Sequence, residues 1–139
     1  MSKVFISWYD GQNHNLANQF FELLEKHGFE VECSPRSPDS GFYDEKWKKW
    51  YQKGLPKAIS RAEIFIAVIT PACDGSSWML QEYQEAYSSF LKKAKPKLYF
   101  IRYDSVERPV KYPDYYLQNS IQLPSIPEEA IHMLLSSSI

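Results

Sequence analysis

The segment Glu63–Ile69, with the sequence EIFIAVI, limits most strongly what this chain can fold into. It is apolar at almost every position and rich in β-branched residues, whereas a strand with one solvated face alternates apolar and polar side chains. A run of this kind predicts a strand that is buried on both faces. Such strands lie in the middle of parallel sheets that carry helices on both faces.

The rest of the chain alternates between strand patterns and helix patterns. Further strands are expected at residues 4–7, 29–33, 97–103 and, as a short fifth strand, 120–123. Helices are expected between a cap at Asn13 or Asn15 and a stop at Gly28, at 44–52 with a final turn to Ile59 after interruptions at Gly54 and Pro56, at 78–92, and at 128–135 after Pro127. We therefore predict a single α/β domain over residues 1–139, with a mostly parallel sheet and helices on both faces.

Composition excludes several classes of function. With 139 residues and a net charge of -1, the chain has neither a positive field for nucleic acid nor a basic tail for a membrane. No apolar run approaches the roughly 18 residues that span a bilayer, and the amino-terminal sequence lacks the apolar stretch of a signal peptide. Cys33 and Cys73 are too few and too far apart for a disulfide framework or a zinc site. We expect a cytoplasmic protein with free thiols and no bound metal.

Ligands of parallel α/β sheets bind beyond the carboxyl ends of the strands. At that rim, Trp78 and Glu82 stand four residues apart at the start of a predicted helix and therefore face the same way. The positive end of the helix dipole favours an ionised carboxylate, and an aromatic face beside an anion suits a flat cation such as a pyridinium. The structural alternative is that Trp78 packs in the core and Glu82 only complements the dipole.

Three further residues lie in predicted rim loops. Trp8 and Tyr9 would be unusual in a loop without a ligand or partner, although a rim aromatic can also fold back on the core. Arg36, in the proline-rich segment Ser34–Gly41, suits a phosphate, but a solvated loop arginine is the alternative. The first loop contains no GxGxxG or GxxxxGK[ST] pattern and is therefore no familiar phosphate cradle.

Four segments carry a resemblance to a known family. They are VFISW at 4–8 with Asp10 following, LLEKHGFEV at 23–31, KAISRAEIFIAVIT at 57–70 and SWMLQE at 77–82. In order and spacing they resemble the Toll/interleukin-1 receptor (TIR) domain family, in its bacterial and plant-like branch, over about the first two-thirds of the chain. The resemblance implies a flavodoxin-like fold with a five-stranded sheet in the order 2-1-3-4-5.

The family works in two ways, and Glu82 indicates which one applies here. Some members cleave NAD+ between nicotinamide and ribose, giving ADP-ribose or cyclic ADP-ribose isomers, and others are non-catalytic scaffolds that associate through TIR–TIR contacts. Catalytic members carry a glutamate at the position that Glu82 occupies. The resemblance thus implies an NAD+ nucleosidase with Glu82 as its catalytic residue, NAD+ as substrate and no cofactor, signalling in bacterial immunity.

The resemblance also assigns substrate contacts and partners. Trp78 is expected to shape the nicotinamide end, Trp8 or Tyr9 to stack on a ring, and Ser7 with Arg36 to contact ribose or diphosphate. Self-association through TIR–TIR contacts is expected, with a separate effector protein as a possible sensor of the product.

Two alternative functions for this chain stay open. The first is a non-catalytic scaffold or adaptor. The second is a nucleoside deoxyribosyltransferase-like enzyme, which shares the layout and a glutamate but acts on free nucleosides. A response-regulator receiver is disfavoured, because it needs paired acids after the first strand and a phospho-accepting Asp after the third, whereas this chain offers Asp10 and a loop residue, Asp74.

Overall fold

Five strands form one parallel sheet in the order β2-β1-β3-β4-β5. The computed structural model describes residues 3–8, 14–33, 53–69, 77–102 and 118–137. Its strands are β1 (Lys3–Ser7), β2 (Glu30–Cys33), β3 (Ile64–Ile69), β4 (Lys97–Arg102) and β5 (Ile121–Leu123). All six residues of β3 are buried, and its neighbours are β1 and β4. The predicted central strand and the predicted strand order are both confirmed.

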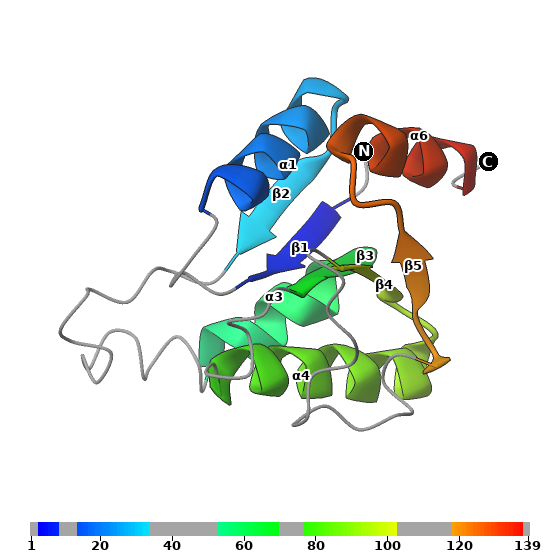
Figure 1. Cartoon of the computed structure of the whole chain (residues 1–139). Helices are drawn as coiled ribbons and strands as arrows, with labels where there is room; N and C mark the ends of the chain where they lie inside the picture. Colours follow the sequence, from blue (N-terminus) through cyan, green and yellow to red (C-terminus); the bar gives the residue numbers. More distant parts are fainter. Residues whose placement is uncertain (1–2, 9–13, 34–52, 70–76, 103–117, 138–139) are drawn as a thin grey trace, which may run out of the picture.

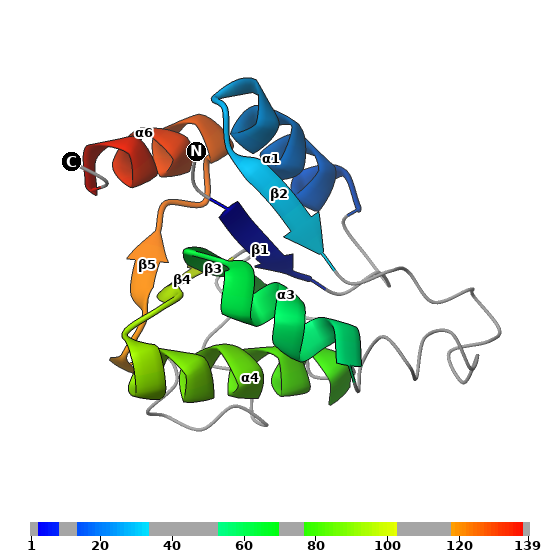
Figure 2. The ribbon, with the colours of Figure 1, turned by 180° about the vertical axis from the view of Figure 1, so that it is seen from behind.

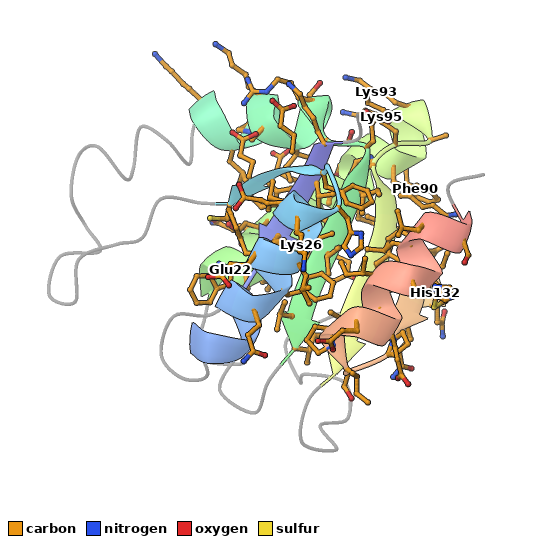
Figure 3. All side chains as sticks on the ribbon, turned by 90° about the horizontal axis from the view of Figure 1, so that it is seen from above. Glu22, Lys26, Phe90, Lys93, Lys95 and His132 are labelled. Atoms are coloured by element: carbon orange, nitrogen blue, oxygen red, sulfur yellow. The ribbon has the colours of Figure 1, made fainter. Side chains whose placement is uncertain are left out.

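Helices cover both faces of this sheet (Figure 1). The helices α1 (His14–Lys26) and α6 (Pro127–Ser137) lie on one face, and α3 (Leu55–Arg61) and α4 (Ser77–Lys93) lie on the other. The view from behind shows α3 and α4 side by side beneath the strands (Figure 2). Seen from above, α1 and α6 lie over the sheet, with the exposed side chains of Glu22 and His132 at their outer sides (Figure 3).

The alternation of side chains along each strand divides the core into two clusters. Phe5 and Phe65 belong to the cluster beneath α3 and α4. Ile6 and Ile66, one position further along the same strands, belong to the cluster beneath α1 and α6. Because the central strand β3 is buried on both faces, its sequence reads as a continuous apolar run.

Helix α1 ends as its sequence predicts. Gly28 has a φ of +89°, and the chain turns there through two hydrogen bonds, from Gly28 N to Glu25 O at 3.0 Å and from Phe29 N to Leu24 O at 3.0 Å. This pair of bonds is the Schellman motif, in which glycine takes the left-handed position because it has no Cβ. The motif directs the chain into β2 and buries Leu24 and Phe29 together.

The start of α1 differs in part from the prediction. The helix begins at His14, so Asn15 lies inside it and is not its cap, while Asn13 lies outside the described residues. The helices predicted at 78–92 and 128–135 are found at 77–93 and 127–137. Differences of one or two residues are usual at helix ends, where the last turn frays.

Pro56 lies in the first turn of α3, and Gly54 occupies the N-cap position of this helix. Proline is tolerated there because the first backbone N–H groups of a helix have no partner within it. The helix ends at Arg61, two residues beyond the predicted end at Ile59. The helix predicted at 44–52 lies outside the described residues.

Two expectations from composition bear on the described part of the chain. None of its helices is both long and apolar enough to cross a membrane. Cys33, the last residue of β2, forms no disulfide among the described residues, and Cys73 lies outside them.

Candidate active site

The carboxyl end of β1 and the second turn of α4 meet at a buried polar contact. The hydroxyl of Ser7 donates to Oε1 of Glu82 at 2.6 Å, and each side chain is 1% exposed. Ser7 is the last residue of β1 and lies on the sheet face that α4 covers. The structure therefore brings together two of the predicted site residues, at the end of the sheet where parallel α/β folds bind ligands.

A carboxylate buried to this extent has lost its hydration shell. That loss costs several kcal/mol unless hydrogen bonds compensate for it. The hydroxyl of Ser7 provides such a bond, and its 2.6 Å length lies in the range for an O–H group that donates to a carboxylate. Glu82 thus occupies a position that core packing would give to an apolar residue.

The helix register explains why Glu82 points inward. Met79, Tyr83 and Ala86 are buried on α4, and Glu82 falls within their stripe at the spacing i, i+3, i+4, i+7. The first turn of α4 contains no acidic residue, so Glu82 lies one turn further from the helix start than the dipole argument assumed. Because the dipole effect falls off within the first turn, Ser7 contributes more to holding this carboxylate than the dipole does.

Trp8 lies next to Ser7 in the sequence but packs on the other side of the sheet. Its half-buried side chain lies against the cluster beneath α1 and α6. Of the two interpretations of Trp8, the structure thus supports packing against the core. Contact with a substrate ring stays a prediction.

The other predicted site residues are not placed by the structure. Tyr9 and Arg36 lie outside the described residues, and for Trp78 only the backbone in the first turn of α4 is described. Their predicted contacts with substrate stay predictions.

Tyr83 is a site neighbour that the sequence analysis missed. It follows Glu82 directly, is fully buried, and its hydroxyl lies 2.5 Å from Oγ of Ser120. Burial raises the pKa of Tyr83 well above its ordinary value, and the hydrogen bond to Ser120 lowers it in part. The signal in the sequence was a phenol within an apolar stripe, since a buried tyrosine hydroxyl needs a partner.

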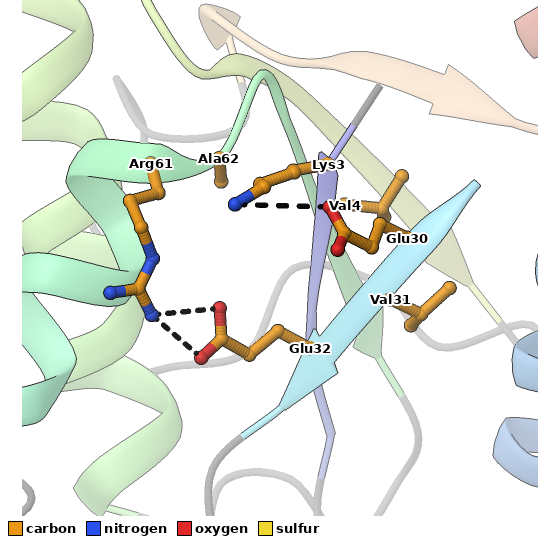
Figure 4. Close-up of a pocket in the computed structure, with 7 residues that line it drawn as sticks. All are labelled: Lys3, Val4, Glu30, Val31, Glu32, Arg61 and Ala62. Carbon is orange, nitrogen blue, oxygen red and sulfur yellow. Dashed lines mark hydrogen bonds and ion pairs between the residues drawn. The ribbon is translucent and has the colours of Figure 1, made fainter. Parts of the chain in front are cut away.

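A separate pocket of about 500 Å³ lies at the opposite end of the sheet (Figure 4). The ion pairs that flank it join Lys3 to Glu30 at 3.8 Å and Arg61 to Glu32 at 3.0 Å. The rest of its lining consists of Val4, Val31 and Ala62. Lys3 and Glu30 are the first residues of their strands, so this pocket lies away from the carboxyl ends. Exposed pairs of this kind contribute little to stability, and we assign the pocket no function.

The described residues do not provide a metal site. Nowhere in that part of the chain do three or more His, Cys, Asp or Glu side chains gather in a way that could hold an ion.

A parallel sheet in the order 2-1-3-4-5, with a buried carboxylate beside its carboxyl edge, defines an α/β domain of flavodoxin-like topology. A family model described as "TIR domain" matches residues 4–135. This chain therefore belongs to the TIR domain family.

Solved structures with the same fold include two that differ in function. The TIR domains of the activated Roq1 resistosome, which directly recognises the pathogen effector XopQ, align with a TM-score of 0.56 and 18% identity over 76% of this chain and 60% of that chain. A 2-deoxyribosyltransferase from Bacillus psychrosaccharolyticus aligns with a TM-score of 0.58 and 14% identity, over 88% of this chain and 85% of that chain. At these identities the likeness shows the fold alone. No curated protein matches the chain.

Proposed function

We propose that this chain is an NAD+ nucleosidase, which cleaves the bond between nicotinamide and ribose and yields nicotinamide with ADP-ribose or a cyclic ADP-ribose isomer. The observation that carries the proposal is the buried carboxylate of Glu82, hydrogen-bonded to Ser7 at the carboxyl end of the sheet. Membership of the TIR domain family supports it, because catalytic members carry a glutamate at this position.

The reaction suits a site whose main group is a carboxylate. When the bond between C1′ of ribose and the pyridinium nitrogen breaks, its electron pair goes to the nitrogen. Nicotinamide therefore leaves as a neutral molecule and needs no general acid. The ribosyl group that remains has oxocarbenium character, which a fixed anion stabilises.

Two acceptors can complete the reaction. Water that adds to C1′ gives ADP-ribose and releases its proton to solvent. A nucleophilic atom of the same molecule gives a cyclic isomer, and a site that excludes water favours this outcome. No cofactor takes part, since NAD+ is the substrate.

Ser7 has a role in this proposal that differs from direct substrate contact. Its hydroxyl donates to Oε1 of Glu82, so we assign Ser7 to orienting the carboxylate. Fixing a catalytic group in its productive orientation removes reorganisation from the reaction step. Trp78, Trp8, Tyr9 and Arg36 complete the proposed substrate contacts.

Self-association belongs to the same proposal. Only 1% of Glu82 is exposed, so the groups around it must move before substrate can touch the carboxylate. We propose that association of TIR domains drives this rearrangement, and the TIR domains of the Roq1 resistosome are a related assembly. The product would then act as a signal in immunity inside the cytoplasm, sensed by a separate effector protein, without binding to nucleic acid or membrane.

The test is incubation with NAD+ and analysis of the products by chromatography and mass spectrometry. The wild type is compared with Glu82→Gln, which keeps the size of the side chain and removes its charge. Glu85→Gln is the matched control, because Glu85 is a half-buried acid on the same helix. We expect nicotinamide release by the wild type and by Glu85→Gln, and a loss of at least about 100-fold in Glu82→Gln.

Each result has a distinct meaning. The absence of nicotinamide release by concentrated wild type would overturn the proposal and favour a non-catalytic scaffold. Equal release by wild type and Glu82→Gln would leave an enzyme but remove Glu82 from its mechanism.

A second candidate is a nucleoside deoxyribosyltransferase-like enzyme. The aligned 2-deoxyribosyltransferase covers more of this chain than the Roq1 TIR domains do, which favours keeping it as a candidate. The same assay distinguishes the two: base exchange between 2′-deoxynucleosides, without cleavage of NAD+, would support the second candidate.

A further inference from the structure

Two consecutive residues of α4 form hydrogen bonds to two distant points of the fold, one at the end of β1 and the other just before β5. Glu82 accepts a hydrogen bond from Ser7 at the end of β1, and the Tyr83 hydroxyl is hydrogen-bonded to Ser120, which immediately precedes β5. Consecutive side chains leave a helix about 100° apart around its axis, so the two hydrogen bonds point in different directions. Both residues are buried, at 1% and 0% exposure.

The strand register shows how far apart these two attachment points lie. Ser7 pairs with Ala67, and Ala67 pairs in turn with Phe100 and that residue with Gln122. Ser120 is therefore three strands away from Ser7 and two residues closer to the amino end. With about 4.8 Å between strands and about 3.3 Å per residue, the separation is roughly 16 Å along a diagonal of the sheet.

Aromatic contacts join the same helix position to β1. The Tyr83 ring meets Phe65 edge to face, with ring centroids 5.2 Å apart. Phe65 in turn stacks on Phe5 with centroids 6.0 Å apart, and Phe5 lies two residues before Ser7 on the same face of β1. Tyr83 thus contacts the core through its ring and Ser120, just before β5, through its hydroxyl.

A helix held at a single polar point can still rotate slightly about its axis. A side-chain tip lies about 5–6 Å from that axis, so a rotation of 10° moves it by about 1 Å. A displacement of 1 Å at a catalytic group can cost about 100-fold in rate. The second attachment, the hydrogen bond between Tyr83 and Ser120, opposes this rotation.

The second attachment is suited to remain in place at physiological pH. Burial raises the pKa of the Tyr83 phenol above its ordinary range, so the hydroxyl stays protonated. The bond to Ser120 therefore joins two neutral groups, and screening by salt has little effect on it.

We infer that Tyr83 is a positioning residue for Glu82, because its hydrogen bond to Ser120 fixes the rotation of α4 and with it the place of the catalytic carboxylate. The inference rests on the proposed function and adds to it a residue that does not touch the substrate. Simple packing by the Tyr83 ring is the competing explanation, and it assigns no role to the hydroxyl.

Tyr83→Phe separates the two explanations, since it keeps the ring and removes only the hydroxyl. We expect kcat for nicotinamide release to fall about 3- to 10-fold while KM changes less than about twofold. Ser120→Ala should give the same result, and the double variant should be no slower than either single variant, because all three lack the same bond. Ser120→Thr, which retains a hydroxyl, should keep most of the wild-type kcat.

Tyr87→Phe is the matched control, because it removes a phenol from a half-buried position one turn further along α4. Its kcat should remain within about twofold of wild type. A wild-type kcat in Tyr83→Phe would overturn the inference, as would additive losses in the double variant or an equal loss in Tyr87→Phe.

The failures of the inference and of the proposed function are distinguishable. If the wild type is active and Glu82→Gln is not, the proposed function stands, and the kcat of Tyr83→Phe alone decides the inference. If the wild type releases no nicotinamide, the proposed function fails and the positioning role fails with it. Urea unfolding adds a measurement that needs no activity. Tyr83→Phe and Ser120→Ala should each lower the free energy of unfolding, and the double variant should lower it by less than the sum of the two. Additive effects would contradict the bond on which the inference depends.

Discussion

The hydroxyl of Ser7 lies 2.6 Å from Oε1 of Glu82 and joins residues 75 positions apart in the sequence. Ser7 ends the first strand, and Glu82 lies in the second turn of the helix that follows the central strand. The segments around these two residues are the first and the last of the four TIR-like segments of the sequence. Their meeting in the fold gives the proposed catalytic residue a fixed orientation.

Ser7→Ala is expected to lower both stability and activity. The substitution leaves a buried carboxylate without the hydroxyl that donates to it, which costs about 1–3 kcal/mol in the free energy of unfolding. Because Oε1 of Glu82 also loses its orientation, kcat for nicotinamide release should fall about tenfold or more. Urea unfolding and initial-rate measurements check the two effects separately.

A second variant, Glu82→Gln, replaces the carboxylate with a neutral amide and is combined with Ser7→Ala. Hydrogen bonds to charged groups are worth more than bonds between neutral groups, so Ser7→Ala should cost less in the Glu82→Gln background than in the wild type. Equal costs in the two backgrounds would contradict a bond between Ser7 and an ionised Glu82.

Activity per molecule is expected to rise with protein concentration. Glu82 is 1% exposed in the single chain, so substrate has little access to this residue in a single domain. If association of copies opens the site, specific activity should increase with concentration and then level off, in parallel with the associated fraction seen by light scattering. Constant specific activity across a range in which light scattering shows association would contradict this part of the proposal.

The sequence predicted the fold well because local patterns encode it. The central position of β3 follows from Ile64–Ile69, which is apolar without interruption, and all six residues of the strand are buried. Gly28 predicted the end of α1 because only a residue without Cβ takes its positive φ easily. Signals of this kind act over a few residues and need no knowledge of distant contacts.

The pairing of site residues was beyond such local signals. Nothing near Ser7 in the sequence indicates that its hydroxyl bonds to Glu82, and nothing near Tyr83 indicates Ser120. Both bonds depend on the register between a helix and strands that are distant in sequence. The sequence allows two interpretations of Trp8 for the same reason, since only the fold shows which cluster its side chain joins.

Gly28→Ala tests the turn that directs α1 into β2. A Cβ at this position would have no heavy atom within 4 Å, so the cost comes from the backbone, whose φ of +89° is strained for alanine. We expect a loss of about 1 kcal/mol in the free energy of unfolding, with kcat unchanged. Gly28→Asn should lose less, because asparagine tolerates positive φ better than alanine. A larger loss in the asparagine variant would contradict the backbone explanation.

Stability at alkaline pH should report the environment of Tyr83. The phenol ionises near its ordinary pKa of 10.0 in the unfolded chain, whereas burial raises its pKa in the folded protein. Above about pH 10 the unfolded state therefore binds fewer protons than the folded state, and the free energy of unfolding falls as pH rises. A single such group contributes a slope of up to about 1.4 kcal/mol per pH unit, and the stability that it adds is fully present below the unfolded pKa.

Tyr83→Phe removes this one titration and leaves the other tyrosines unchanged. The difference in unfolding free energy between the wild type and Tyr83→Phe should be constant between about pH 7 and pH 9 and then shift against the wild type as the pH rises further. Urea unfolding at a series of pH values measures this difference directly. A difference that stays constant up to about pH 11 would mean that Tyr83 ionises as readily in the folded protein as in the unfolded chain, which its burial does not allow.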